Sequence, residues 1–399
     1  LGKESILLQL QFAGAEVLQQ EEVHQPTGDE LCLLTDLEPL EVKRLMTQIE
    51  EDGALGRLFD IDVMTAEIPK ISRQQLGLPP RRCLLCEQQA AVCARSQAHD
   101  IRQLQSRTVQ IICEQLMARC ADDIASTACR ALLYEVHTAP KPGLVDRDNS
   151  GAHSDMQETT FFDSSCALYP YFRQAALLGA QYGSNGDAFQ KLRWKGKQAE
   201  QRMRRATGGV NTHKGAVFSV GIVCAALGRL DRSLWAEAAR VLAEVSAMTA
   251  GLTEKDFAGV TAENAATVGQ KLYIQYGITG VRGQVEAGLP TVLNVGLPVL
   301  EEGLAKGYDF DRASSGALLA ILANSTDTNI IARSSRERQL ALTEELKALL
   351  AQTPYPDKDV LAALDDRFIA ENLSPGGSAD LLALTWLLHF VTTEGNINE

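Results

Sequence analysis

The sequence lacks the features that mark membrane, secreted and repetitive proteins. Its longest apolar stretch, residues 216–227, is interrupted by Ser219 and is well short of the roughly 20 residues that a membrane-spanning helix needs. The first residues have no basic region followed by an apolar one, so we see no secretory signal. No low-complexity tract or internal repeat is present. We therefore expect a folded cytoplasmic protein, and the start at Leu1 rather than Met suggests a fragment or trimmed form.

Basic residues are also scarce. Lys and Arg number 38 against 51 Asp and Glu, which gives a formal net charge of −13. A nucleic-acid binder needs a basic surface that neutralises many phosphates, so this balance argues against nucleic acid as a partner. Any nucleotide bound here must meet a local basic pocket. The nine cysteines, an odd number in a chain without a secretory signal, indicate reduced thiols rather than a disulfide framework.

The composition that remains suits two globular domains. The chain has 399 residues, 45% of them hydrophobic and 22% charged, which is the ordinary globular range. Up to about residue 82 the pattern is mixed, and from about residue 100 onward apolar residues recur at helical spacing without convincing strands. We predict early helices over 5–20 and 40–51, early strands over 30–35 and 58–64, and later helical segments at 124–136, 218–230, 235–248 and 381–391.

The predicted fold class is therefore mixed: a small α/β (α+β) N-terminal domain, residues 1–118, is followed by a larger all-α domain, residues 119–399. No glycine- or serine-rich linker marks the break, which lies near residues 115–121. A helix over 101–119 can itself be the connector.

Two polar segments between the predicted helices carry most of the reactive side chains. Residues 135–155 crowd two His, a Lys, an Arg and three Asp into a loop that its prolines keep from being helical. Residues 207–215, Thr-Gly-Gly-Val-Asn-Thr-His-Lys-Gly, run into an apolar helix, where backbone amides and the helix N-terminus favour an anion. The alternatives are a solvated loop and a simple turn. The second segment is not a Walker A loop.

A third polar group lies further along the chain. Arg282 stands among glycines in a setting that suits a phosphate clamp, and Asp327 could meet a metal. The alternative is a turn and a helix cap. From the residues alone, the C-terminal region is a nucleotide-handling helical enzyme.

Four motifs in this region resemble the triphosphoribosyl-dephospho-CoA synthase family of citrate lyase operons. They are Glu-Val-His-Thr-Ala-Pro-Lys-Pro-Gly-Leu-Val-Asp-Arg, Thr-Phe-Phe-Asp-Ser-Ser, Gly-Gly-Val-Asn-Thr-His-Lys-Gly and Gly-Val-Arg-Gly-Gln-Val-Glu-Ala-Gly. The similarity covers roughly residue 121 to the C-terminus. It implies that ATP and 3′-dephospho-CoA are converted to 2′-(5″-triphosphoribosyl)-3′-dephospho-CoA and adenine.

Such a reaction needs a base, a metal and cations that hold the triphosphate. We assign three carboxylates as candidate catalytic or metal-binding groups: Asp146, Asp148 and Asp163. The candidate phosphate-binding residues are Lys141, Arg147, Gly208, Gly209, His213, Lys214 and Arg282. The triphosphate and the carboxylate-rich loop imply Mg²⁺ as cofactor.

The N-terminal region holds a second possible metal site. In Gly56-Arg-Leu-Phe-Asp-Ile-Asp-Val63, period-two alternation places Asp60 and Asp62 on one side of the predicted strand, where they can share a divalent metal. The alternative is an exposed strand face with two acids. Cys83, Cys86, Cys93 and His99 could supply four zinc ligands, but Leu84-Leu85 and Ala90-Ala91 suggest thiols buried on helices, so we leave zinc out of the metal sites.

The Arg-Leu-Phe-Asp-Ile-Asp and Arg-Arg-Cys-Leu-Leu-Cys motifs resemble the holo-citrate lyase synthase family over roughly residues 10–118. These phosphoribosyl-dephospho-CoA transferases join the prosthetic group to a serine of the citrate lyase acyl carrier protein and release diphosphate. The chain lacks that family's N-terminal portion, so impaired transfer is expected. Two alternatives stay open: the equivalent synthase for malonate decarboxylase, and an N-terminal half that only docks the carrier protein.

Overall fold

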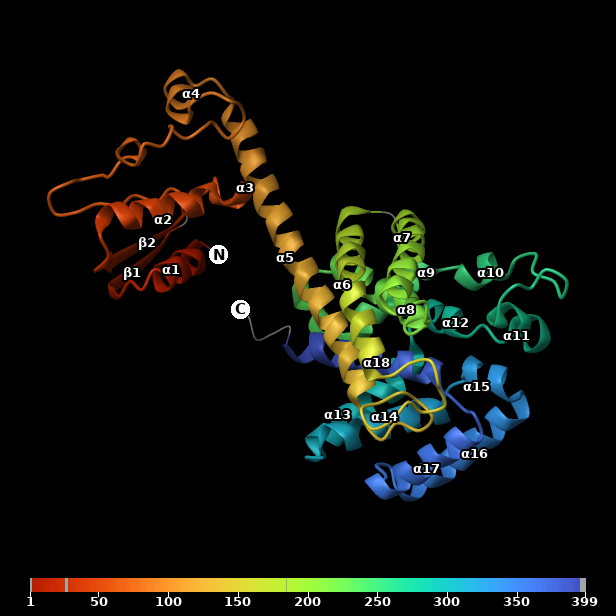
Figure 1. Cartoon of the computed structure of the whole chain (residues 1–399). Helices are drawn as coiled ribbons and strands as arrows, with labels where there is room; N and C mark the ends of the chain where they lie inside the picture. The colour runs from red at the N-terminus through yellow and green to blue at the C-terminus, as the bar shows by residue number, and fades with distance from the viewer. Residues whose placement is uncertain (1, 26–27, 184, 395–399) are drawn as a thin grey trace. The chain divides into compact units, whose positions relative to one another are not determined.

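The computed structural model describes residues 2–25, 28–183 and 185–394, and it divides into two compact units (Figure 1). Unit 1 comprises residues 1–116 and unit 2 residues 117–399. The boundary falls inside one helix, α5 (Ile101–His137), which continues from one unit into the other. None of the described helices is long and apolar enough to cross a membrane.

Unit 1 is a small α+β fold built around one hairpin. Its elements are α1 (Gly2–Phe12), β1 (Val17–Gln25), β2 (Gly28–Thr35), α2 (Pro39–Glu51), α3 (Gly53–Gly56), the 3₁₀-helix η1 (Arg73–Leu76) and α4 (Ala90–Ser96). The antiparallel strands β1 and β2 pair in a register that sets Glu21 opposite Cys32. A small core of six buried residues joins α1, α2 and the segment after them: Leu10, Val42, Met46, Ile49, Val63 and Ile71.

Two sequence predictions for this unit are wrong. The helix predicted over 5–20 ends at Phe12, because Gly14 takes a left-handed φ of 73° and the chain turns into β1. The strand predicted over 58–64 is absent, since these residues form an irregular segment. The peptide groups of Ile61 are satisfied by side chains of α2: its N–H donates to Glu50 Oε1 at 3.0 Å, and its carbonyl accepts from Lys43 Nζ at 2.9 Å.

The described residues of unit 2 form helices joined by loops and no strand, as the sequence predicted. The predicted helix over 235–248 is interrupted at Glu237, where a 3₁₀-turn gives way to a helix. After α5 the elements are α6 (Glu158–Gln181), α7 (Asn185–Ala206), α8 (Lys214–Arg229), η2 (Arg232–Ala236), α9 (Ala238–Thr249), α10 (Leu252–Phe257), α11 (Val268–Tyr276), α12 (Val281–Glu286), the π-helical turn η3 (Val292–Gly296), α13 (Leu297–Ala305), α14 (Phe310–Ala323), α15 (Thr328–Arg333), α16 (Arg336–Gln352), α17 (Lys358–Ala370) and α18 (Gly376–Glu394).

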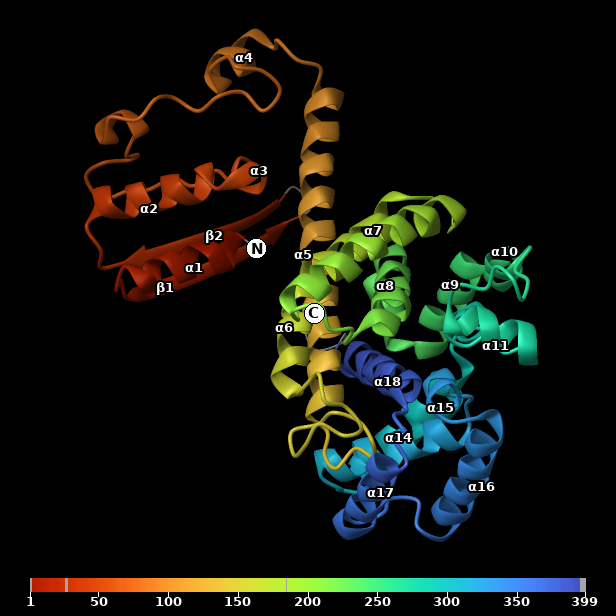
Figure 2. The ribbon, with the colours of Figure 1, turned by 45° about the vertical axis from the view of Figure 1, so that its right-hand side comes forward.

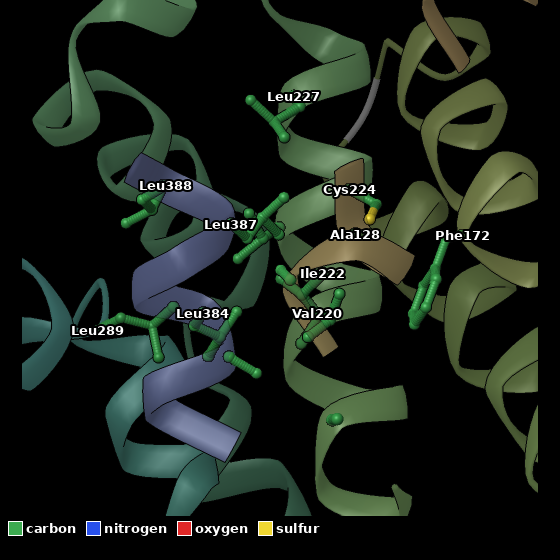
Figure 3. Packing of buried hydrophobic residues seen from close by; sticks show 14 of the residues in the cluster. Ala128, Phe172, Val220, Ile222, Cys224, Leu227, Leu289, Leu384, Leu387 and Leu388 are labelled. Carbon is green, nitrogen blue, oxygen red and sulfur yellow. The ribbon is translucent and has the colours of Figure 1, made fainter. Parts of the chain in front are cut away.

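The core of unit 2 surrounds α8, α14 and α18. These helices are apolar on almost every side, a pattern that requires burial rather than a surface position. α18 packs against both α8 and α14, and Figures 1 and 2 show the three together. Figure 3 shows Leu387 of α18 lying between that helix and α8. The mixed fold class, with a small α+β part and a large all-α part, is confirmed.

Helices α6 and α8 pack closely against each other through two glycines. A Cβ on Gly179 would lie 2.0 Å from the carbonyl oxygen of Ala225, and a Cβ on Gly228 would lie 2.1 Å from that of Ala176. Both positions therefore demand glycine, because the atoms in the way belong to helix backbone that cannot yield. This contact fixes the direction of α8, whose first turn forms part of the candidate site.

Candidate active site

A cavity of about 690 Å³ lies in unit 2, where several helices begin. The long helices α8 and α18 start at its wall, with Lys214 and Gly215 from the first and Gly376 and Gly377 from the second. The short helices α12 and α15 also begin there. Unpaired N–H groups and the positive dipole end of a long helix favour an anion, so the cavity is suited to a negatively charged ligand.

Asp380 is the most unusual acid in the cavity wall. Its Oδ2 would lie only 1.9 Å from a Cβ at position 215, so the glycine allows this carboxylate to sit over the first turn of α8. Burial raises the pKa of Asp380 well above its usual range, and the nearby charges of Glu135 and Asp327 raise it further. The N–H of Ala216 donates to Asp380 and opposes these effects without cancelling them. The carboxylate is therefore suited to a cationic partner.

His213 precedes α8 and is almost fully buried in the cavity wall. Its Nδ1 lies 2.7 Å from Ser164 Oγ, which in turn accepts a hydrogen bond from Thr212 at 2.8 Å. Its Nε2 has no hydrogen-bond partner among the described residues. Burial, together with the charge of Lys141, lowers the pKa of His213 to about 3, so the ring is neutral at ordinary pH.

A buried ion pair forms another part of the wall. Lys141, 1% exposed, donates from Nζ to the carbonyl of Glu135 at 2.8 Å and to its Oε1 at 2.5 Å. Burial raises the pKa of Glu135, while the attraction of Lys141 counters part of that effect. Both side chains line the cavity. The pair places a cation and an acid within reach of a ligand.

The opposite part of the wall comes from α15 and the loop that contains His153. Asp327, which the sequence suggested as a possible metal ligand, instead accepts from the N–H groups of Asn329 at 2.9 Å and Ser378 at 2.7 Å. Its carboxylate is therefore used to cap α15 and to hold the start of α18. Arg333 donates to the carbonyl of Ala152 at 3.0 Å. Burial and the charge of Arg333 lower the pKa of His153.

Four residues predicted to bind phosphate lie together in this wall: Lys141, His213, Lys214 and Arg282. Lys214 is half exposed, and its Nζ lies 4.0 Å from Glu200 Oε2. Arg282 Nε donates to Asp256 at 2.7 Å. Segments far apart in the sequence therefore supply one group of side chains, in which Lys141, Lys214 and Arg282 are basic and His213 is neutral.

The three predicted catalytic acids and Arg147 are not among the residues that line the cavity. Asp146 is buried and accepts from the N–H groups of Lys141 and Asp148, each at 2.8 Å, so it shapes the loop. Asp148 is exposed, with Lys358 at 3.8 Å, and Asp163 is exposed on α6.

Arg147 forms a two-pronged pair with Asp311: Nη1 lies 2.9 Å from Oδ1, and Nη2 lies 2.5 Å from Oδ2. The guanidinium therefore ties the loop to α14. This contact uses two of its five N–H donors in place of a phosphate.

The glycine pair at 208–209 has a different local role from the predicted one. Both residues adopt left-handed φ values, 64° and 99°, directly after the end of α7. The Gly209 N–H returns to the carbonyl of Arg204 at 2.6 Å, and Arg204 Nη1 donates to the Gly209 carbonyl at 3.0 Å. The pair thus terminates α7, which is a common use of glycine after a helix. Asn211 and Thr212 line the cavity in their place.

The strand on which the predicted metal site of unit 1 depended is absent. Asp60 and Asp62 lie in the irregular segment after α3, so no strand places them on one side. Asp60 Oδ1 accepts from Arg81 at 3.3 Å, and Asp62 lies 2.6 Å from Lys70 Nζ. Both acids are exposed and have cationic partners on the protein surface.

From the sequence, no role was assigned to Glu135, Asp380 or Arg333, which all line the cavity. Glu135 opens the polar loop, but it lies within the last turn of α5. Asp380 carried a usable signal, because it is the single acid ahead of the apolar run 381–391. A charged side chain at the start of a buried helix is unusual unless it has a partner or a function, and Asp380 lines the cavity.

Known proteins resemble both parts of the chain. Residues 121–398 match the CitG family, described as ATP:dephospho-CoA triphosphoribosyl transferase, and residues 2–115 match the CitX family, described as apo-citrate lyase phosphoribosyl-dephospho-CoA transferase. Protein CitXG of Leuconostoc mesenteroides subsp. cremoris is 36% identical over 92% of this chain and 81% of its own length. Protein CitXG of Haemophilus influenzae is 34% identical over 96% and 84%. The 2-(5''-triphosphoribosyl)-3'-dephosphocoenzyme-A synthase of Pectobacterium atrosepticum is 40% identical over 68% and 90%.

These matches define the class first: the chain is a transferase. It belongs to the CitG family and carries a CitX part ahead of it, which confirms the fusion predicted from the motifs. The protein acts in the biosynthesis of the citrate lyase prosthetic group.

Proposed function

We propose that the cavity of unit 2 binds ATP and transfers its triphosphoribosyl group to the 2′-hydroxyl of 3′-dephospho-CoA. The bond from C1′ of the ATP ribose to adenine breaks, and a new bond forms from that carbon to the 2′-oxygen. Adenine leaves with the electron pair and takes up one proton, which balances the proton lost by the hydroxyl. One observation carries the proposal: α8 and α18 begin at a cavity lined by Lys141, Lys214 and Arg282.

The cationic wall explains how an acidic protein can bind a triphosphate. The net charge is −13, yet four basic side chains face one cavity together with two helix N-termini: Lys141, Lys214, Arg282 and Arg333. Charge-assisted hydrogen bonds to phosphate are the stronger kind, and a low-dielectric wall strengthens them further. We assign these residues to the phosphates of ATP.

His213 supplies a neutral donor to the same ligand. Thr212 donates to Ser164 Oγ, so the Ser164 hydroxyl is free to donate to His213 Nδ1. The ring proton then resides on Nε2, the atom without a partner among the described residues. A buried N–H without a partner costs roughly 1–3 kcal/mol, which a phosphate oxygen would recover on binding.

Mg²⁺ fits this site as the partner of the triphosphate. Asp380 offers a carboxylate whose charged form is disfavoured by burial and by two neighbouring acids, and a divalent cation would relieve that penalty. Glu135 is the second acid in reach of the same space. When bound, Mg²⁺ would neutralise the phosphates and help to orient them.

For unit 1 we propose transfer of the prosthetic group to the citrate lyase acyl carrier protein. The match of residues 2–115 to a phosphoribosyl-dephospho-CoA transferase supports this proposal. We retain Asp60 and Asp62 as candidate metal ligands, although each has a cationic neighbour. Asp62→Asn should then abolish labelling of the carrier protein and leave adenine release intact. Retained carrier binding without any labelling by the wild-type chain would instead favour a docking module.

The decisive measurement for unit 2 is chromatographic detection of free adenine from ATP, Mg²⁺ and dephospho-CoA. Asp380→Asn should abolish release, whereas the exposed Asp366→Asn should behave as the wild type. CoA should react only feebly, because its 3′-phosphate crowds the attacking hydroxyl and brings charge close to the bound triphosphate. Release of AMP or diphosphate in place of adenine would refute the proposed reaction.

A further inference from the structure

Three sulfurs and one imidazole nitrogen meet at a single point of unit 1. The ligand atoms of Cys83, Cys86, Cys93 and His99 all lie within 4.8 Å of one another. Cys86 Sγ lies 3.5 Å from Cys93 Sγ, and His99 Nε2 lies 3.3 Å from Cys86 Sγ. No other group of three or more such ligand atoms is found among the described residues.

These spacings suit tetrahedral coordination. Zinc binds sulfur at about 2.3 Å and imidazole nitrogen at about 2.0–2.1 Å. Tetrahedral geometry then sets two sulfurs about 3.8 Å apart and a sulfur and a nitrogen about 3.6 Å apart. The observed separations of 3.5 and 3.3 Å are within a few tenths of an ångström of these edges. A small adjustment of side chains would complete the tetrahedron.

The backbone around the first two cysteines forms a short hairpin that presents them together. Arg82 and Gln89 form an antiparallel bridge, and the Cys83 N–H donates to the Gln88 carbonyl at 2.7 Å. The Leu85 N–H points back to Cys83 Sγ at 3.5 Å, a contact that stabilises negative charge on the sulfur. The expectation that these thiols lie on helices is thus wrong for Cys83 and Cys86.

The other two groups come from α4 and the turn after it. Cys93 lies inside α4, and Gln97, with a left-handed φ of 51°, ends that helix and turns the chain toward His99. Four side chains from a hairpin, a helix and a turn therefore converge. Neither a shared helix face nor a shared strand face brings them together. Convergence of this kind indicates a ligand.

Apart from these four side chains, few buried residues stabilise the segment 81–99. In the stretch 81–99, all of it described, the buried apolar residues are Cys83 and Cys93 alone. The core cluster of unit 1 draws no member from this stretch. Arg57 Nη2 secures the backbone from outside by donating to the carbonyls of Arg82 at 2.7 Å and Cys83 at 3.1 Å. A short segment without a core is usually held by a metal or a disulfide.

We propose that unit 1 binds one structural Zn²⁺ ion through the Sγ atoms of Cys83, Cys86 and Cys93 and the Nε2 atom of His99. Four protein ligands close the coordination sphere, and a closed site is structural rather than catalytic. Three thiolates and a neutral imidazole leave the bound site with one net negative charge. The ion fixes the stretch immediately before α5, which begins at Ile101.

Metal content of the full chain tests the proposal directly. The chain is produced with zinc in the medium and passed over a desalting column, and its zinc content is measured by inductively coupled plasma mass spectrometry. We expect about one zinc per chain in the wild type and a loss of at least five-fold in Cys86→Ser and His99→Ala. Cys113→Ser, which changes an exposed thiol of α5, should retain the wild-type content. His99→Cys should also retain it, because four thiolates bind zinc equally well.

Cobalt substitution covers the case in which a variant fails to fold. The wild-type chain is stripped of metal under reducing conditions and titrated with Co²⁺. Ligand-field bands of a tetrahedral thiolate site should grow to saturation at about one equivalent, and added Zn²⁺ should abolish them. Zinc-free wild-type protein without such bands would overturn the proposal. A Cys86–Cys93 disulfide in the freshly isolated chain, found by peptide mapping, would overturn it as well.

Discussion

Units 1 and 2 are stabilised in different ways. Unit 2 has a continuous core around α8, α14 and α18, in which most side chains are fully buried. Unit 1 has a core of six residues, with the charged side chains of Lys43 and Glu50 buried beside it. A small core contributes little stability, and such units usually depend on polar networks, metals or cross-links. Fold stability in the two halves should therefore respond to different kinds of change.

The distribution of aromatic residues allows each half to be followed separately. All three tryptophans and all eight tyrosines of the chain lie after residue 117. Tryptophan and tyrosine fluorescence therefore reports on unit 2 alone. Hydrogen exchange measured on peptides of unit 1 supplies the complementary readout.

The largest effect is expected where two helix backbones of unit 2 meet. Gly179→Ala places a Cβ about 2.0 Å from the Ala225 carbonyl, so α6 and α8 must separate. We expect a loss of about 3 kcal/mol in the free energy of unfolding, seen as an earlier urea midpoint in fluorescence. Gly183→Ala is the control, because nothing lies within 4 Å of its added Cβ. Equal stability of the two variants would show that packing at this contact is looser than the structure implies.

The next effect belongs to unit 1 and concerns charge. Glu50→Gln removes the buried carboxylate that accepts from Ile61 and lies 3.4 Å from Arg73. Breaking a buried ionic contact costs about 3 kcal/mol, and partial exposure of Arg73 brings the expected loss nearer 2 kcal/mol. Glu51→Gln is the matched control: it pairs with the same arginine but is exposed, so its effect should stay below about 1 kcal/mol. Exchange should quicken in unit 1 peptides, and fluorescence unfolding should be unchanged. Matching effects of the two variants would contradict this view of unit 1.

The third prediction concerns how the stability of unit 2 depends on pH through His213. The pKa of His213 is about 3 in the folded chain and near 6.5 when unfolded, so the unfolded state binds the proton first as the pH falls. Unit 2 should therefore lose about 2 kcal/mol from this group between pH 7 and pH 5. His213→Gln should lose correspondingly less over the same interval in urea titrations. An identical pH dependence in both proteins would mean that His213 is not buried in its neutral form.

The smallest effect concerns binding rather than folding. Lys214→Ala removes a half-exposed cation from the cavity wall, so the KM for ATP should rise about five-fold, or roughly 1 kcal/mol. Lys358→Ala, on α17 and outside the cavity wall, should leave the KM unchanged. Fluorescence unfolding should be the same for both. A fall in kcat at constant KM would place Lys214 in the chemical step instead.

Some of the site could be predicted from the sequence, and particular residues show why. Lys214 and His213 follow a polar, glycine-bearing segment that opens an apolar helix, and both line the cavity. Asp146 stands in an equally polar loop, yet its carboxylate is taken up by backbone N–H groups of that loop. Sequence alone does not distinguish an acid that shapes a loop from one that faces a ligand.

Other residues depended on contacts that no local pattern encodes. Asp380 reaches the first turn of α8 only because Gly215 lacks a Cβ, and these positions are far apart in the chain. Asp60 and Asp62 alternate as strand residues do, but α2 satisfies the intervening Ile61 peptide through Glu50 and Lys43. Tertiary partners therefore overrode a local signal in unit 1 and created a new site in unit 2.

The residues that line the cavity extend in sequence from Glu135 to Leu381, so some of them are far apart in the chain of unit 2. Contacts between distant segments form slowly in folding, because closing the long stretch of chain between them costs conformational entropy. A nascent or nicked chain that lacks α18 should consequently have no ATP site, however much of its helical structure is present. Under the proposed function, ATP should therefore protect the whole of unit 2 against proteolysis, with a benefit that grows with ATP concentration.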